Sequence, residues 1–327
     1  MAGSSVSVNY NVRPCKSIER RMMCEMLSRL TPFDRICEYR YIGMGAKYFV
    51  DFSMLHKEFG MEKMYSMEIC SDENNTNRFN FNKPFNCIEM LFGNAGDILK
   101  SSRLKWDNIK NIIWLDYDGG ITSTQLQDVE TCVGKVESGS VVFVSFNSDL
   151  GTCFKKSSPE EKMEIYCNRI DNEFLTKRIV PKDVSKGRID ATTNKMFDMI
   201  IKNKILERNS TIKEAENKYN YHQLLYFKYK DSVAEMITMG WIIYKKADED
   251  KYEKCGFPEL EFFNDTDQPY DITVPNFTYK ELTVLNRNMP DAKYPIKEAQ
   301  FLSEEEINAY KKIYRYYPTT FETAVVL

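Results

Sequence analysis

Two nearly continuous runs of apolar residues constrain the fold of this chain most strongly. They are "NIIWLDYD" at 111–118 and "SVVFVSFN" at 140–147. A strand with one solvent-exposed face alternates apolar and polar side chains, whereas these runs predict strands that are covered by helices on both faces. Such strands are typical of a parallel sheet in an α/β protein.

Predicted strands and helices alternate over the first part of the chain. Two further β-rich runs, "HQLLYFKYKD" at 222–231 and "AEMITMGWIIYKK" at 234–246, lie close together and predict an antiparallel hairpin. The fold class is therefore α/β, with a doubly wound, mostly parallel seven-stranded sheet that ends in this hairpin. The first five strands are expected at Tyr39–Ile42, Lys63–Glu68, Cys87–Phe92, Ile109–Leu115 and Ser140–Ser145.

The sequence predicts three parts around this sheet. Apolar residues recur at helical spacing from Ser17 to Leu30, which predicts a helix near the N-terminus. After Ala247 the chain becomes acidic and then proline-containing, which suggests a linker. The expected parts are an N-terminal helical segment covering the cleft (1–37), a Rossmann-like core (38–247) with a helical insertion (159–220), and a C-terminal α-rich appendage (248–327), with helices near Thr278–Asn288 and Ser303–Tyr314.

Composition excludes several functional classes. The net charge of −3 lacks the strong positive field of a protein that mainly grips nucleic-acid phosphates, although it leaves a local basic groove open. The nine cysteines form no Cys-x-x-Cys pair, which indicates reduced thiols and a cytoplasmic protein. Two histidines are too few for a three-histidine zinc site. Neither a leader peptide nor a membrane helix is expected.

Mostly polar residues follow the predicted strands, where doubly wound sheets bind their ligands. A glycine turn lets the backbone approach a ligand, and a carboxylate about 20 to 25 residues later can accept hydrogen bonds from ribose hydroxyls. Glu68 lies 23 residues beyond Gly45, so the pattern predicts a site for an adenosine-bearing cofactor. The residues at the successive strand ends are Gly43, Gly45 and Lys47; Glu68; Asn94; Asp116 and Asp118; Asn147 and Asp149.

This order resembles the class I S-adenosylmethionine-dependent methyltransferases, over about residues 38–246, and a poorly characterised O-methyltransferase-like group. The glycine loop, the acidic end of the second strand, Gly93-Asn94-Ala95, the aspartate after the fourth strand and the closing hairpin carry the resemblance. It implies S-adenosylmethionine as cofactor. It also implies that Gly43 and Gly45 line the methionine and ribose, that Glu68 binds the ribose hydroxyls, that Asn94 contacts adenine and that Asp116 faces the methyl group.

The loop Gly-Met-Gly-Ala-Lys departs from the family pattern. It has one glycine fewer than the fuller motif, and Lys47 is an unusual neighbour for a cofactor that is positively charged at sulfur. Either Lys47 points away from the cofactor, or the loop serves a ligand with a phosphate or carboxylate at that place. We therefore count Lys47 among the candidate cofactor-binding residues.

Asp116, Asp118 and His222 are the candidate catalytic residues. Asp116 or His222 could remove a proton from the methyl acceptor, although Asp-Gly-Gly also forms turns readily. Oxygen ligands from Asp116, Asn147 and Asp149 would suit Mg²⁺, but we expect no metal. The N-terminal stretch "VRPCKSIERR" could supply cations to the cleft or simply form the charged face of a helix.

The favoured function is methyl transfer from S-adenosylmethionine to an oxygen or nitrogen nucleophile of an unidentified small molecule or macromolecule. The alternative is a catalytically silent module that binds an adenine nucleotide or a partner protein, which Lys47 and the missing glycine favour. The closing hairpin and the incomplete glycine pattern disfavour a nicotinamide-dependent oxidoreductase. An oligomer formed through the C-terminal appendage is left open, and no membrane partner is expected.

Overall fold

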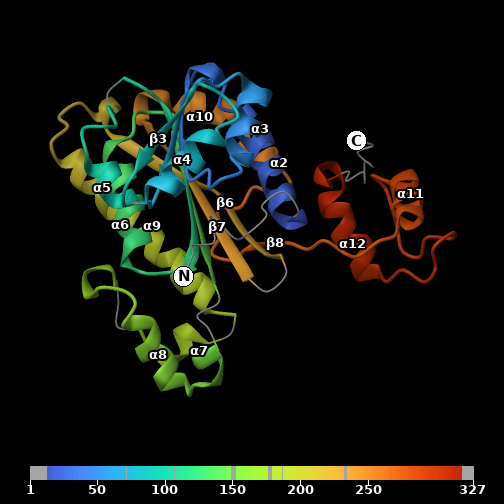
Figure 1. Cartoon of the computed structure of the whole chain (residues 1–327). Helices are drawn as coiled ribbons and strands as arrows, with labels where there is room; N and C mark the ends of the chain where they lie inside the picture. The colour runs from blue at the N-terminus through green and yellow to red at the C-terminus, as the bar shows by residue number, and fades with distance from the viewer. Residues whose placement is uncertain are drawn as a thin grey trace.

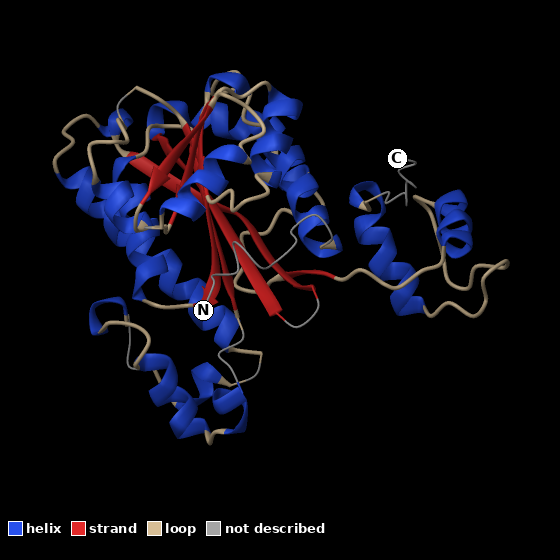
Figure 2. Cartoon of the chain, in the orientation of Figure 1, coloured by secondary structure: helices blue, strands red, loops and turns tan. Residues whose placement is uncertain are grey.

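The computed structural model describes residues 13–70, 72–106, 108–148, 152–175, 179–185, 187–231 and 234–318. A mixed β-sheet crosses the middle of the molecule, and helices cover it on both sides (Figure 1; Figure 2). Two further groups of helices project from this body. One lies below the sheet in the view of Figure 1, and the other lies to its right.

In the described parts of the chain, eight strands form the sheet, in the order β3-β2-β1-β4-β5-β7-β6-β8. Strands β1 to β5 are parallel, and β7 pairs antiparallel with both β5 and β6. The predicted α/β class is confirmed, but the sheet has one strand more than the seven predicted. The strands are β1 (Arg40–Gly43), β2 (Lys63–Glu68), β3 (Ile88–Phe92), β4 (Asn111–Gly120), β5 (Ser140–Asn147), β6 (Tyr219–Asp231), β7 (Ala234–Lys245) and β8 (Tyr270–Ile272).

Helices pack on both faces of the sheet, as its apolar strands require. Helices α2 and α3 lie on one face, and α5, α6 and α9 lie on the other (Figure 1). Within the described ranges, we find no helix with the length and apolar content needed to span a membrane. The α-helices are α2 (Pro14–Ser28), α3 (Val50–Phe59), α4 (Glu73–Phe81), α5 (Ala95–Lys100), α6 (Ser123–Lys135), α7 (Thr152–Lys156), α8 (Pro159–Cys167), α9 (Ile189–Ser210), α10 (Glu249–Cys255), α11 (Tyr279–Asn288) and α12 (Glu304–Ile313).

The N-terminus of α2 is held by a distant strand. Pro14 occupies the first turn, where its missing N–H costs nothing. The backbone N–H groups of Cys15 and Lys16 each donate to a carboxylate oxygen of Asp231, at 3.0 Å, and Asp231 is the last residue of β6. This carboxylate caps the helix and favours its positive dipole end. The cap therefore fixes α2 against the sheet.

The additional strand, β8, covers part of the outer edge of β6. It pairs in parallel with Phe227–Tyr229 of β6. Next to it, the backbone N–H of Asn264 donates to the Leu224 carbonyl at 3.1 Å, and the Gln223 side chain donates to the carbonyls of Asn264 and Thr266 at 2.9 Å. Sequence patterns missed this strand because it has only three residues and follows a proline.

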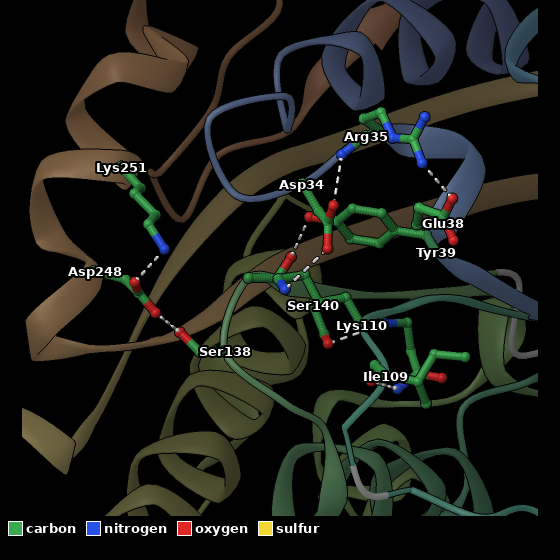
Figure 3. A network of polar contacts seen from close by, with 12 residues as sticks. Asp34, Arg35, Glu38, Tyr39, Ile109, Lys110, Ser138, Ser140, Asp248 and Lys251 are labelled. Carbon is green, nitrogen blue, oxygen red and sulfur yellow. Dashed lines mark hydrogen bonds and ion pairs between the residues drawn. The ribbon is translucent and has the colours of Figure 1, made fainter.

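A polar network joins loops at the edge of the sheet where the parallel strands begin (Figure 3). The Tyr39 hydroxyl donates to the Gly139 carbonyl at 3.1 Å. The Ser138 hydroxyl donates to Asp248 at 2.5 Å, and Asp248 also pairs with Lys251 at 2.7 Å. The chain beyond residue 247 is therefore tied directly to the sheet, and the separation of a C-terminal appendage at 248–327 stays a prediction.

The C-terminal helical part also contacts α2. Glu25 of α2 accepts a hydrogen bond from the Tyr316 hydroxyl and pairs with Arg315 at 2.9 Å. The Arg21 guanidinium donates to the Tyr317 carbonyl at 3.2 Å. One side of α2 therefore faces the sheet while another contacts the end of the described chain.

We expect Gly240→Ala to destabilise the fold by about 1–3 kcal/mol, because an added methyl overpacks a well-filled core. Gly240 of β7 lies opposite Phe143 of β5, and a Cβ atom there would lie 2.2 Å from the Phe143 ring. Denaturant unfolding measures the change. Gly119→Ala is the matched control, because a Cβ there would meet no atom within 4 Å. Equal stability of the two variants would contradict this account of the β5–β7 packing.

Candidate functional site

The carboxyl ends of β1 to β5 meet at one edge of the sheet, which we call the carboxyl-end edge. Strand register places Gly43 beside Ser66, Glu68 beside Phe92, and Asp116 beside Ser145. Helices α7 and α8 follow β5 and lie beyond this edge (Figure 1). Most of the predicted site residues are therefore brought to one side of the molecule.

Both glycines of the turn after β1 are required by packing within the chain. A Cβ atom at Gly43 would lie 2.5 Å from the Tyr41 hydroxyl oxygen, and one at Gly45 would lie 2.6 Å from the Phe49 ring. The turn also holds Ala46 and Phe49 at positive φ, 47° and 49°. The glycine pattern thus has a structural cause, whether or not a ligand also uses the turn.

Glu68 fastens this turn to the end of β2. Its carboxylate accepts a hydrogen bond from the backbone N–H of Ala46 at 2.6 Å, while the Gly45 N–H donates to the Ser66 hydroxyl at 3.0 Å. Glu68 is only 8% exposed. Burial raises its pKa to about 7, and the negative charge of Asp118 adds to that rise against the opposing effect of the Ala46 hydrogen bond.

The side chains of Lys47 and Asn94 each contact residues close to them in the sequence. The Lys47 ammonium lies 5.1 Å from the centre of the neighbouring Tyr48 ring, a cation–π arrangement. The Asn94 side chain is exposed and accepts a hydrogen bond from the Gly96 N–H at 2.9 Å, which caps the N-terminus of α5. The predicted contact of Asn94 with adenine would therefore have to be made alongside this cap.

Ile69 is a candidate that sequence reasoning missed. It follows Glu68 directly and is 81% exposed, although isoleucine is usually buried. It therefore presents an apolar surface beside a buried carboxylate at the carboxyl-end edge. Its position immediately after the acidic strand end is the signal that could have identified it.

Asp116 and Asp118 lie within β4 rather than after it, because the strand continues to Gly120 with an irregularity between Asp116 and Gly120. Asp118 is exposed, and its charge acts on Glu68. Between them, Tyr117 points toward α6, where its hydroxyl donates to Asp128 at 2.5 Å. The Tyr117 side chain is therefore directed toward α6 and bonded there.

Asp116 belongs to a largely buried group of ionisable side chains under α2, which we call the α2 charge cluster. Lys16 pairs with Asp116 at 2.9 Å and with Glu19 at 3.0 Å, and Arg20 pairs with Asp51 of α3. Lys16 is buried and its ammonium is paired within the chain, whereas Arg21 is exposed. The supply of cations to a substrate in the cleft stays a prediction. The cluster comprises Lys16, Glu19, Arg20, Asp51 and Asp116.

The structure does not bring His222, a predicted catalytic base, together with the other candidate residues. It lies near the start of β6, where it is opposite Ile242, and Ile242 is opposite Val141 at the start of β5. Its ring stacks on Tyr252 and Tyr244, with centroid distances of 4.5 and 5.8 Å. Strand β6 runs parallel to β5, so it opens at the edge far from Asp116.

The structure describes only two of the three oxygen ligands considered above for Mg²⁺, Asp116 and Asn147. Asn147 ends β5 beside Gly120, while Asp149 lies outside the described residues. Where the structure describes the chain, no group of three or more His, Cys, Asp or Glu side chains could hold a metal ion. A separate groove of about 630 Å³ runs between α2 and α3, and its lining includes Arg20, Met54 and Phe59 but none of the predicted site residues.

A comparison with protein-family models identifies this chain. The model described as "Putative O-methyltransferase" matches residues 8–325. The chain belongs to that family. A search of curated proteins found no match.

Solved structures similar to this member of the O-methyltransferase family are distant. An rRNA methylase from Streptococcus thermophilus has 8% identity and a TM-score of 0.34, with 68% of this chain and 95% of that chain covered. A "putative O-methyltransferase" from Klebsiella pneumoniae has 10% identity and a TM-score of 0.34, covering 72% and 81%. LepI in complex with SAM has 7% identity and a TM-score of 0.35, covering 66% and 46%. The chain thus spans less than half the length of LepI.

The raised pKa of Glu68 predicts a pH-dependent stability difference from Glu68→Gln. The folded state binds the Glu68 proton more tightly than the unfolded chain does, since the Glu68 pKa in the unfolded chain has its ordinary value of 4.5. The resulting stabilisation is present at low pH and is lost as the pH rises through about 7. Between pH 5 and pH 8, wild type should lose about 2–3 kcal/mol of unfolding free energy relative to the variant.

Denaturant unfolding of both proteins at the two pH values measures this difference. Glutamine can still accept the Ala46 hydrogen bond, so the loop is preserved. Glu62→Gln is the control, because Glu62 is exposed and lies just before β2, at the opposite end of the strand from Glu68. A difference that does not change with pH would show that Glu68 is ionised as easily in the folded state as in the unfolded one.

Proposed function

We propose that the chain transfers a methyl group from S-adenosylmethionine to an oxygen or nitrogen nucleophile, with oxygen favoured by its family. The observation that carries this proposal is the connection between Glu68 and the glycine turn, since the Ala46 N–H donates to the Glu68 carboxylate at the carboxyl-end edge. A turn held beside an acidic strand end is suited to a nucleoside ligand.

The residues at this edge fit the parts of the cofactor. Glu68 has a second carboxylate oxygen with which to meet a ribose hydroxyl, in addition to the oxygen that receives the Ala46 N–H. Ile69 offers an exposed apolar surface for the adenine ring. Gly43 and Gly45 would contact the methionine part through their backbone atoms, since Tyr41 and Phe49 fill the space of their missing Cβ atoms. When bound, S-adenosylmethionine supplies a methyl group already activated by a positively charged sulfur.

Asp116 is our candidate for orienting the acceptor. Its side chain is 15% exposed, and Lys16 holds one of its oxygens. A carboxylate fixed in this way can receive a hydrogen bond from the hydroxyl or amine that is to be methylated, and so orient it for attack on the methyl group. Most of the catalytic gain in methyl transfer is expected from this alignment. Asp118, whose charge acts on Glu68, would contribute to the electrostatics of the nucleoside side.

The alternative is an adenine-nucleotide-binding module without turnover, and Lys47 in the glycine turn is the observation that favours it. Its ammonium beside Tyr48 could meet a phosphate group. Lys47→Ala separates the two functions. It should weaken binding of ADP strongly if the module holds nucleotides, and should scarcely change binding of S-adenosylmethionine.

We expect calorimetric titration to show binding of S-adenosylmethionine and of S-adenosylhomocysteine. At pH 8, where most of Glu68 is ionised, Glu68→Gln should weaken both by about tenfold or more, because it removes a charged hydrogen-bond acceptor. Glu62→Gln, which changes the same residue type at the other end of β2, should leave both affinities unchanged. A wild type that binds ADP but neither adenosyl ligand would overturn the methyltransferase assignment.

A further inference from the structure

An ammonium group already occupies the inner side of Asp116. The Lys16 Nζ atom lies 2.9 Å from Asp116 Oδ1, 3.0 Å from Glu19 Oε2 and 4.4 Å from the centre of the Trp114 ring. The Lys16 residue is only 1% exposed. Trp114 and Asp116 are two residues apart on β4, so the ammonium lies against the part of this strand where the proposed methyl transfer takes place.

The surrounding structure holds this ammonium in place. Asp231 caps the N-terminus of α2 through the backbone N–H groups of Cys15 and Lys16, so the helix cannot slide along its axis without losing both bonds. The Tyr229 hydroxyl donates to Glu19 at 3.2 Å, and the Trp114 indole donates to Ser145 at 2.8 Å. Each group that contacts the ammonium therefore has its own support from the sheet.

A carboxylate and the face of an indole are also what would attract a positively charged sulfur. In the α2 charge cluster, Lys16 and Arg20 face the carboxyl groups of Glu19, Asp51 and Asp116. Burial raises the pKa of Glu19, with a further rise from Asp116 that the attraction of Lys16 opposes. The Lys16 ammonium lies between the carboxyl groups of Asp116 and Glu19, so its positive charge offsets part of the negative potential at this strand end.

We propose that Lys16 determines how the cofactor site discriminates between charged and neutral sulfur, because its ammonium offsets the charge of Asp116 that would otherwise favour the sulfonium. This inference rests on the proposed function, since it requires that the site bind S-adenosylmethionine. The site then holds the neutral thioether S-adenosylhomocysteine at least as tightly as S-adenosylmethionine.

The test is calorimetric titration of the full chain with both ligands, without any methyl acceptor. In wild type, S-adenosylhomocysteine should bind as tightly as S-adenosylmethionine or more tightly. Lys16→Met removes the charge but keeps the length of the side chain, so it should shift the affinity ratio about tenfold toward S-adenosylmethionine. Lys16→Arg keeps the charge and should leave the ratio unchanged.

Arg21→Gln is the matched control, because it removes one positive charge from the exposed side of the same helix. It should not change the ratio. Asp116→Asn provides a second test if Lys16→Met fails to fold: with the ammonium retained and the carboxylate neutralised, the ratio should shift further toward S-adenosylhomocysteine.

Each outcome bears on the inference separately from the proposed function. Binding of both ligands with the same ratio in wild type and Lys16→Met would overturn the role of Lys16 and leave the cofactor assignment intact. A wild-type preference of tenfold or more for S-adenosylmethionine would also overturn it. If the wild type binds neither ligand, the proposed function fails, and the inference fails with it.

Discussion

The ion pair between Lys16 and Asp116 is the interaction on which the arrangement of the candidate site depends. It joins the first described helix to the fourth strand across a hundred residues of sequence, in a place where water is almost excluded. Buried ion pairs add little net stability, but removing one partner costs about 3–5 kcal/mol because the other charge is left uncompensated. The pair thus fixes α2 against the sheet more than it strengthens the fold.

The general architecture could be predicted because both faces of β4 and β5 are apolar, and helix-length segments separate the strands. The positions of Gly43, Glu68 and Asp116 at one edge follow directly, since parallel strands place their carboxyl ends together. The position of His222 could not be predicted from the sequence pattern. Its position depends on the direction of β6, and α9 returns the chain to the opposite edge before that strand begins.

The glycine turn shows a different limit of sequence reasoning. A ligand approaching the backbone and a side chain packing beneath it both require the absence of a Cβ atom. At Gly43 the Tyr41 hydroxyl fills that space, and at Gly45 the Phe49 ring does so. The contacts of Lys16 were likewise beyond prediction, because a lysine on an amphipathic helix is exposed in most proteins and nothing local in the sequence indicates its distant carboxylate partner.

The cover over β6 has a consequence for the exposed edge of the sheet. Strand β6 has thirteen residues, many of them buried and aromatic, and its outer edge is occupied by the Asn264–Thr266 segment and β8. An uncovered strand of this kind exposes a row of backbone donors and acceptors that another chain can match. The segment after the hairpin therefore covers the edge of β6 and hinders strand pairing between this sheet and a neighbouring copy.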